Sequence, residues 1–522
     1  MKKCIAVLLT LCLMLSLCGF SAKVTLKGSG TEKDPYLISN AKELQKAAAL
    51  LNDKDTFNDY YEAHYRLTAD IDLGGKKWEP ILWFKGVFDG NGHTISGLKV
   101  KYSKAMNGFY GTKETDFGLF AELSDAVVRD LTIRDSSFVI TTKAGSAGAL
   151  AGHALDTVIE NCHVADSVTV SAPSQAGGLI GSASDGQIIN CTNAAAVTST
   201  DANAGGIAAM CDSIQDCVNS GTITAADNAG GIAATLNSSA TNCENTGKIT
   251  AQEYAGGICA SFGDGALSSK DNDNTVTMKA CTNSGSITSE ADPAGGITAK
   301  ASAGSIVECV NTGAVTSGDA EAGGIAGFFQ PSPFGTPAET FSIENCENSG
   351  EVIAKAKTAN EPAGGILGYI YACDTEITIR GCANSGKVDA EGVHDVFDGV
   401  GEAGGILGGG RVRMLTITDC INSGDITGAT YAGGIVGEAE PADAETESTF
   451  LAENCTNSGT VNAVRMSSKD HTAYAGGILG FSRSESDTNG IFQILEITGC
   501  KNTGKLTGTT GKVRTDNIRA GE

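Results

Sequence analysis

Two short patterns, one polar and one apolar, alternate along most of the chain. The polar pattern is Cys-x-Asn followed by a turn, and the apolar pattern is Ala-Gly-Gly-Ile or Ala-Gly-Gly-Leu. Each occurs ten times between about residue 162 and the C-terminus. Apolar residues with period two, such as Leu415 and Ile417, precede the cysteines, which is typical of strands with one buried face. A unit repeated this often predicts a solenoid rather than several separate globular domains.

The length of the repeat indicates which solenoid forms. The shortest units, from Cys191 to Cys217 and from Cys217 to Cys243, span 26 residues. That length fits three short strands with their corners, which make one coil of a β-helix, and it is too short for a four-stranded propeller blade. We therefore expect an all-β fold, a right-handed parallel β-helix (a β-solenoid) with a short N-terminal capping helix.

The repeats also predict what fills the inside of each coil. The residue before the cysteine is Asn, Asp or Gly in nine of eleven units, and these residues tolerate the left-handed backbone of a corner. Equivalent positions of a parallel stack lie about 4.8 Å apart, so like side chains stack on like. We expect the asparagines to form an amide ladder and the cysteines to form a column of buried, mostly free thiols.

Each of the two predicted columns contains ten residues. The cysteines are Cys191, Cys217, Cys243, Cys281, Cys309, Cys346, Cys382, Cys420, Cys455 and Cys500. The asparagines are Asn193, Asn219, Asn245, Asn283, Asn311, Asn348, Asn384, Asn422, Asn457 and Asn502.

The part of the chain that follows the leader divides into three predicted regions. Residues 23–64 should form an N-terminal cap, 65–146 the initial β-helix coils, and 147–522 the regular repeats. In the cap, Asn40 and Glu43 make a capping box, and apolar residues at helical spacing follow it. An amphipathic helix here would cover the open end of the stack.

The first 22 residues have the pattern of a secretory signal peptide. Lys2 and Lys3 precede an apolar run that ends in small residues and is too short to span a membrane. The segment Leu15 to Cys18 resembles a lipoprotein box, although Leu17 stands where a small residue is expected, so a lipid anchor at Cys18 is an alternative. We expect a secreted or cell-surface protein with no transmembrane segment after the signal peptide.

The chain is strongly acidic, and this limits its partners. The formal net charge is −24 and the isoelectric point is about 4.6. Such a surface repels phosphate backbones and anionic lipids, so we expect no nucleic-acid partner. The expected partner is an unidentified glycan or protein on a host or bacterial surface.

Few residues have the spacing of a catalytic or metal site. Asp70, Asp72 and Asp89 are the best carboxylate cluster, although Asp-Ile-Asp-Leu-Gly-Gly and Asp-Gly-Asn-Gly are also ordinary turn sequences. The Asp271 to Asn274 segment lacks the spacing of a calcium loop. We find no Cys-x-x-Cys or His-Glu-x-x-His motif, and we expect no metal, no cofactor and no catalytic residue.

Aromatic residues flank some of the glycine strands. Tyr254, Tyr431 and Tyr474 precede them, and Phe328, Phe329, Tyr369 and Phe481 follow them. An exposed row of these rings could stack on sugar rings or contact a protein. The alternative is that they pack in the core.

The glycine strands resemble the GLUG-motif repeats of secreted and surface proteins of bacteria, Firmicutes among them. Gly28 to Val100 is similar to the opening segment of many such proteins. The GLUG-like segments are 177–181, 323–327, 364–368, 404–408, 433–437 and 476–480. The resemblance implies a surface β-helix. The family includes adhesins and immunoglobulin A peptidases, but the peptidases carry a zinc protease domain whose motif is absent here.

These observations predict a non-enzymatic, adhesin-like repeat protein that presents a β-helix for adhesion or for ligand or glycan binding. Its variable contacts would be insertions at 263–275, 329–342, 391–402, 438–450 and 465–472. One alternative is a carbohydrate-active β-helix enzyme of the polysaccharide lyase or hydrolase kind. Another is a passive stalk for a domain beyond Glu522.

Overall fold

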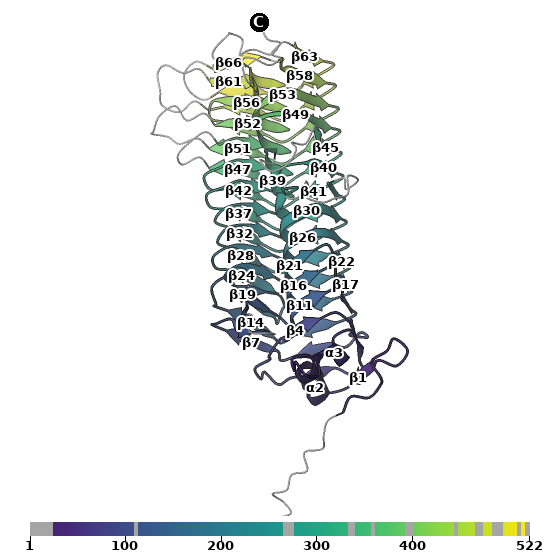
Figure 1. Ribbon diagram of the computed structural model, residues 1–522. Helices are drawn as coiled ribbons and strands as arrows, with labels where there is room; N and C mark the ends of the chain where they lie inside the picture. The colour runs from purple at the N-terminus through teal and green to yellow at the C-terminus, as the bar shows by residue number, and fades with distance from the viewer. Residues whose placement is uncertain are drawn as a thin grey trace, which may run out of the picture.

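The protein is a long stack of similar coils, as its computed structural model shows in Figure 1. The structure describes residues 25–108, 113–264, 276–331, 340–355, 361–391, 401–442, 447–464, 473–482, 494–508 and 513–516. The predicted signal peptide, Cys18 and the Asp271 to Asn274 segment lie outside these residues, as do all of the predicted insertion 465–472 and parts of the other four.

One coil illustrates the whole stack. Its sides are β27 (Val218–Asn219), β28 (Ile223–Ala225), β29 (Ala229–Gly230) and β30 (Ala233–Thr241). Each side pairs in parallel and in register with the same side of the next coil. The sides build sheets of 24, 13, 14 and 13 strands over the described residues. The predicted all-β parallel β-helix is confirmed.

The coil has more strands than the three that its length suggested. The first two residues of Ala-Gly-Gly form a short strand of their own, as in β29. A separate antiparallel hairpin, β8 (Met106–Asn107) with β9 (Lys113–Glu114), leaves the stack near its N-terminal end.

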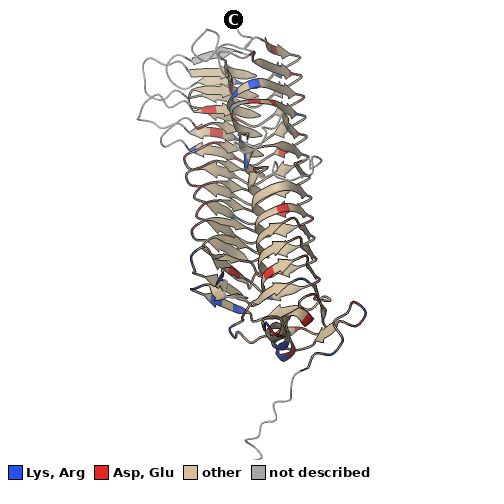
Figure 2. Ribbon diagram, viewed as in Figure 1, with Lys and Arg blue, Asp and Glu red and all other residues tan. Residues whose placement is uncertain are grey.

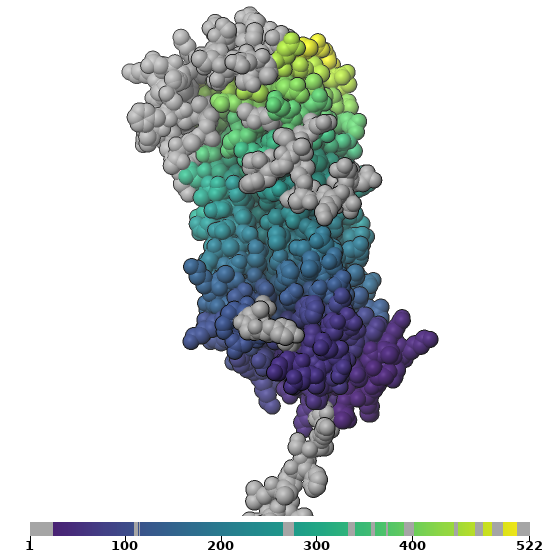
Figure 3. Space-filling view, in the orientation of Figure 1, coloured from purple at the N-terminus to yellow at the C-terminus, as the bar shows by residue number. Residues whose placement is uncertain are grey.

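The N-terminal end is covered by a helix, as the capping box predicted. In α2 (Ala41–Leu51), the Asn40 side chain accepts hydrogen bonds from the N–H groups of Lys42 and Glu43, both at 3.1 Å. Glu43 in turn accepts from the N–H of Ser39 rather than that of Asn40. The apolar face of α2 is buried. Figure 3 shows this region as the purple end of the rod.

The predicted cap also contributes the first rungs of the stack. The strand β1 (Tyr36–Ile38) pairs in parallel with β2 (His64–Leu67), so the regular pairing begins inside residues 23–64. A second short helix, α3 (Phe57–Tyr60), lies between them and was not predicted. Segments 65–146 and 147–522 share the same sheets, since β11 (Phe120–Ser124) pairs with β16 (Ala151–Leu155) across their boundary.

Every corner before the repeat cysteine is left-handed. All eleven residues at this position have a φ between 51° and 64°. Nine of them are the Asn, Asp and Gly residues that the sequence pointed to. The other two, Ala280 (φ 53°) and Glu308 (φ 56°), adopt the same backbone without a favourable side chain.

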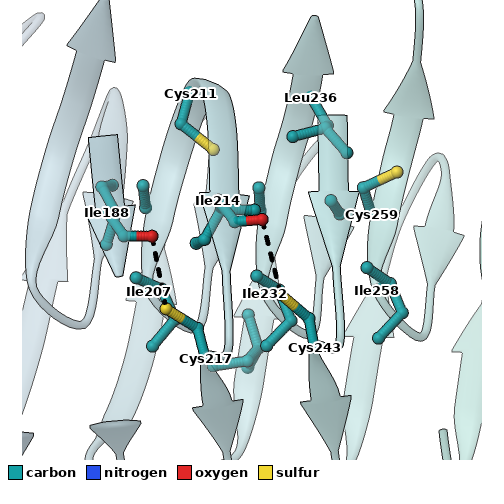
Figure 4. Close-up of a cluster of buried hydrophobic side chains, with 14 of the residues drawn as sticks. Ile188, Ile207, Cys211, Ile214, Cys217, Ile232, Leu236, Cys243, Ile258 and Cys259 are labelled. Carbon is teal, nitrogen blue, oxygen red and sulfur yellow. Dashed lines mark hydrogen bonds between the residues drawn. The ribbon is translucent and has the colours of Figure 1, made fainter. Parts of the chain in front are cut away.

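The cysteines form the predicted column inside the stack. Each thiol donates hydrogen bonds to backbone carbonyls, and Figure 4 shows Cys217 bonded to the carbonyl of Ile188 and Cys243 bonded to that of Ile214. All cysteines whose side chains are described are free thiols, and all but Cys500 are buried. Cysteine therefore acts here as a small apolar residue with a weak donor.

Cys211 and Cys259 belong to the core but not to the column. Cys211 pairs in register with Leu236, and Cys259 pairs with Ala233, both on the long side of the coil. Burial raises the pKa of the Cys259 thiol to about 12, so this thiol is a poor nucleophile at neutral pH.

The asparagines stack as an amide ladder beside the cysteines. From Asn193 to Asn502 each Nδ2 donates to the Oδ1 of the next asparagine, at 2.7 to 2.9 Å. The same Nδ2 also donates to the carbonyl two residues on, as Asn219 does to Gly221 at 3.0 Å. The buried amides are thereby satisfied along the stack.

The ladder runs through one sheet of two-residue strands. They are β23 (Thr192–Asn193), β27, β31 (Glu244–Asn245), β36 (Thr282–Asn283), β41 (Val310–Asn311), β46 (Glu347–Asn348), β50 (Ala383–Asn384), β54 (Ile421–Asn422), β59 (Thr456–Asn457) and β64 (Lys501–Asn502).

The ladder explains why the two sequence patterns occur together. The second glycine of each Ala-Gly-Gly faces the asparagine of the next polar pattern, and a Cβ at Gly206 would lie 2.5 Å from Cγ of Asn219. Any side chain at that glycine would collide with the amide. The apolar pattern therefore needs glycine where the polar pattern places asparagine.

Candidate binding strip

The three carboxylates predicted as a cluster are engaged by turns. Asp70 Oδ1 accepts from the N–H of Thr94 at 3.0 Å and lies 3.3 Å from Nδ1 of His93. These two contacts lower the pKa of Asp70, the backbone hydrogen bond more than the histidine. Asp72 Oδ1 accepts from the N–H of Gly74 at 2.7 Å, which is an Asx-turn.

Asp89 is buried between two coils. Its Oδ2 lies 3.0 Å from Arg66 and 3.2 Å from Arg129, and its Oδ1 accepts from the N–H of Asn91 at 2.8 Å. Each of the three candidate aspartates thus has partners of its own in a turn or an ion pair. This arrangement supports a structural role for Asp70, Asp72 and Asp89 rather than a catalytic one.

A different set of aromatic and acidic residues, some partly exposed and some buried, gathers in the C-terminal half. It lies where the Ala-Gly-Gly strands meet the next side of the coil, and we name it the aromatic–carboxylate strip. The strip consists of Tyr254, Glu321, Phe328, Glu361, Tyr369, Tyr371, Glu402, Tyr431, Glu438, Glu440, Tyr474 and Phe481.

Two neighbouring sheets hold the strip. On the Ala-Gly-Gly side the strands are β33 (Ala255–Gly256), β43 (Ala322–Gly323), β48 (Ala363–Gly364), β52 (Glu402–Gly404), β56 (Tyr431–Gly433) and β61 (Ala473–Gly476). On the next side they are β44 (Ala326–Phe329), β49 (Leu367–Arg380), β53 (Leu407–Thr418), β57 (Val436–Pro441) and β62 (Leu479–Ser482).

Strand register aligns the second side of the strip in one column. Phe328 pairs with Tyr369, Tyr369 with Gly409, and Glu438 with Phe481. Gly409 and Glu438 occupy equivalent positions in β53 and β57. The column therefore carries an outward side chain on each of these rungs except at Gly409.

The rings of the strip touch one another in two groups. In the first, the ring centroid of Phe328 lies 5.8 Å from Tyr254 and 5.4 Å from Tyr371, and that of Tyr371 lies 5.2 Å from Tyr369. The Tyr371 hydroxyl donates to Glu321 Oε1 at 2.8 Å. Tyr371 is 38 % exposed, so this group reaches the surface.

The second group lies nearer the C-terminus. Tyr431 and Phe481 stack in parallel with centroids 4.3 Å apart, and Tyr474 lies 5.8 Å from Tyr431 and 5.4 Å from Phe481. All three rings are partly exposed. They offer an apolar ring surface with hydroxyl groups at its edge.

Carboxyls fill the space between the two groups. Gly409 leaves room for one of them, since a Cβ there would lie 2.1 Å from Oε2 of Glu402. Glu402 is 1 % exposed, and its carboxyl lies beside that of Glu438. Burial, and then the neighbouring Glu438, raise the pKa of Glu402 well above its ordinary value.

Further carboxyls lie on both sides of this pair. Arg411 Nε donates to Glu440 Oε2 at 3.0 Å, which neutralises that carboxylate. Burial raises the pKa of Glu321, and burial together with the charge of Glu321 raises the pKa of Glu361 to about 8. Several glutamates on adjacent rungs thus hold protons at pH values where exposed glutamates are ionised.

The sequence pointed to part of this strip. Tyr254, Tyr369, Tyr431, Tyr474 and Phe481 are partly exposed on these coils, whereas Phe328 is buried at 3 % exposure although its ring touches Tyr254 and Tyr371. Phe329 is not part of the strip, because it is fully buried and stacks on Phe341 in the core. The glutamates were missed, although a signal existed: Glu321 and Glu402 stand directly before Ala-Gly-Gly, at the place that Tyr254, Tyr431 and Tyr474 occupy.

Residues 172–198 match the family model of the GLUG motif. The predicted resemblance to GLUG-motif proteins is confirmed there. In the part of the chain that the structure describes, no helix is long and apolar enough to cross a membrane, and no three His, Cys, Asp or Glu residues are grouped to hold a metal ion.

Two curated relatives match about a quarter of the chain. Halomucin of Haloquadratum walsbyi is 32 % identical over 148 residues, which are 26 % of this chain and 1 % of that protein. A protein of Evansella cellulosilytica named "Putative Gly-rich membrane protein" is 31 % identical over 154 residues, which are 27 % of this chain and 15 % of that protein. The chain therefore matches only a small part of either relative.

One solved structure is also similar. It is named a "putative immunoglobulin A1 protease" from Bacteroides ovatus and is 17 % identical. The alignment covers 68 % of this chain and 76 % of that one, with a TM-score of 0.28.

Proposed function

We propose that the protein is a secreted or cell-surface repeat protein, without catalytic activity, that binds a glycan along the aromatic–carboxylate strip. The observation that carries the proposal is the gathering of outward rings and carboxyls on one face of an otherwise uniform stack. The relatives named as a halomucin and as a membrane protein, and the signal-like leader, support a location outside the cell.

The strip has the chemistry that glycans require. Aromatic rings cover the apolar faces of sugar rings, and hydroxyls and carboxyls at the ring edges bond sugar hydroxyls. Figure 2 shows that most positions along the strands are neither Lys, Arg, Asp nor Glu. Rungs recur at about 4.8 Å along the strip, which suits an extended polymer better than a compact ligand.

The shape of the acid pair argues against hydrolysis at this place. Glycosidases separate their two carboxyls by about 5 Å or more so that a sugar or a water fits between them. Glu402 and Glu438 instead hydrogen-bond directly to each other. This pair therefore does not support the alternative that the protein is a carbohydrate-active enzyme.

Alanine at the outermost rings tests the proposal. The double variant Tyr431→Ala with Phe481→Ala should lose most of its binding on a glycan array and in calorimetry, because both stacked rings are removed. Trp83→Ala is the matched control, since Trp83 is a partly exposed ring of the same outward column that stacks on Phe57 and Tyr61 near the cap. Binding that survives the double variant, or turnover of a bound glycan by the unchanged protein, would contradict the proposal.

A further inference from the structure

One region near the N-terminal end of the stack has the opposite charge to the rest of the chain. The whole chain carries a formal net charge of −24, whereas residues 72–104 contain six lysines and three acidic residues. Two of these acids are already engaged, because Asp72 closes an Asx-turn and Asp89 is buried between two arginines. The net charge of the chain therefore hides a local positive region.

Five of these lysines gather around the first strand of one sheet. The strand β7 (Lys99–Tyr102) is the terminal strand of a 13-stranded sheet. Lys77 lies beside Lys99 in a parallel bridge, and Lys101 points to the same side of β7 as Lys99 because it is two residues further on. Figure 2 shows blue on β7 and next to it. We name as the lysine patch the exposed residues Lys76, Lys77, Lys99, Lys101 and Lys104.

Strand geometry places the charges of the lysine patch close together. Neighbouring rungs are about 4.8 Å apart, which separates Lys77 from Lys99, and two residues along a strand span about 7 Å, which separates Lys99 from Lys101. Nζ of Lys77 lies 4.4 Å from the ring centroid of Tyr102, and this contact holds the ammonium group against the sheet. The patch therefore presents positive charges in two directions, along the strand and across the rungs.

The ammonium groups of the lysine patch are not neutralised by carboxylates. Among the described residues, the lysines in ion pairs are Lys85, Lys279, Lys300 and Lys387, and none of them belongs to the patch. Glu79 is the exposed acid in the same segment of the chain. Exposed charges are screened beyond about 8 Å at physiological ionic strength, so the acids of distant rungs do not cancel the patch.

We propose that the lysine patch binds a linear polysaccharide that carries sulfate or carboxylate groups along its length. The patch contains no arginine, so it offers point charges rather than a planar fork that reads the shape of one anion. Affinity should therefore follow the charge density of the polymer. The patch lies apart from the aromatic–carboxylate strip, and the inference does not rest on the proposed function.

The acidity of the rest of the chain favours a single polysaccharide chain over larger anionic partners. A membrane surface or a long nucleic-acid duplex that reached the patch would also approach the acidic rungs beyond it and be repelled. A flexible single chain contacts the lysines without covering those rungs. The size of the positive area thus selects among polyanions.

Charge reversal on β7 tests the inference. The double variant Lys99→Glu with Lys101→Glu should bind heparin at least about tenfold more weakly at low ionic strength, as measured by calorimetry. The control is Lys248→Glu with Lys505→Glu, which changes the net charge equally. These two lysines are exposed and, like Lys99, directly precede the first apolar residue of a rung of this sheet.

The probes are heparin, chondroitin sulfate and hyaluronan, in order of decreasing charge density, with uncharged dextran for comparison. We expect affinity to fall in this order and to fall as salt is added, while the Tyr431→Ala and Phe481→Ala double variant keeps its affinity for heparin. Absence of heparin binding at low salt, or an equal loss in both charge-reversal variants, would overturn the inference. Tighter binding of duplex DNA or of phosphatidylglycerol vesicles than of heparin would also overturn it.

Discussion

The inside and the outside of the same coils follow opposite rules. Inside, ten successive rungs place asparagine at one position and cysteine at another. On the outward column, successive rungs carry Phe328, Tyr369, Gly409, Glu438 and Phe481. The backbone pairing is the same in both cases, so the backbone does not cause the difference.

The difference shows where the fold restricts the choice of residue. An inward asparagine is bonded by the asparagine before it and bonds the one after it, so one changed rung leaves two neighbours without a partner. An outward residue has no such obligation. The residues of the outward column can therefore vary to suit a ligand. We look for a function at the strip for this reason.

The largest effect should come from breaking the ladder. Asn311→Leu removes the donor to Asn348 and the acceptor of Asn283, both at 2.7 to 2.8 Å, and leaves buried amides unsatisfied. We expect a loss of about 3–5 kcal/mol, as one to three kcal/mol is typical for each orphaned buried group.

Denaturant unfolding followed by hydrogen exchange near residue 311 measures this loss. Thr312→Ala is the control, because Thr312 is the exposed neighbour of Asn311. A cost below about 1 kcal/mol, near that of an ordinary surface change, would mean that the ladder does not hold the stack.

The next effect concerns Glu361 of the aromatic–carboxylate strip, which should make the stability of the protein depend on pH. The pKa of Glu361 is raised from 4.5 to about 8, so its folded form holds a proton that the unfolded chain has lost. Its contribution is complete below pH 4.5 and is lost as pH rises to about 8. The slope between these values is about 1.4 kcal/mol per pH unit at most.

Glu361→Gln should remove that slope. Unfolding measured at several pH values tests it, with Glu347→Gln, a change at an exposed glutamate, as the control. A slope that persists in Glu361→Gln would assign the pH dependence to other groups and not to the buried glutamate.

Adding a side chain at the second glycine of an Ala-Gly-Gly pattern should lower the unfolding free energy by a somewhat smaller amount. A Cβ at Gly206 would lie 2.0 Å from the carbonyl oxygen of Gly231 and 2.5 Å from Asn219, so Gly206→Ala forces the rungs apart. We expect a loss of about 1–3 kcal/mol in unfolding free energy. Wild-type stability in this variant would show that the two patterns are not coupled.

The smallest effect should be a gain. Ala280 holds a φ of 53° at a corner where most units have Asn, Asp or Gly. Ala280→Asn should therefore raise the midpoint of thermal unfolding, with a gain of about 1 kcal/mol. Ala303→Asn is the control, because Ala303 is not among the left-handed residues and asparagine there should give no gain. An equal gain at both positions would contradict this explanation.

The sequence predicted the stack because its rules are local and repeated. Cys-x-Asn, the corner before it and Ala-Gly-Gly recur often enough to define a coil, and Asn40 with Glu43 marked the capping helix. The strip was harder to predict. Its members, such as Glu402 and Glu438, are 36 residues apart in the chain and meet only because register places β52 beside β57.

Strand register and local turns also separate residues that look alike or close together in the sequence. Phe329 follows a glycine strand as Phe328 does, but the two point to opposite faces, and only the register shows which of them is outward. Asp70, Asp72 and Asp89 were grouped because they are close in sequence, yet each is engaged by its own turn or arginines.

The central prediction is that the inner residues stabilise the fold and the residues of the strip bind the glycan. The most direct test measures glycan affinity and unfolding free energy on the same Tyr431→Ala and Phe481→Ala double variant. We predict that binding falls by at least about tenfold, the equivalent of 1.4 kcal/mol, while the ladder keeps the hydrogen-exchange protection of the unchanged protein. Unchanged affinity, or loss of protection along the ladder together with binding, would contradict the account.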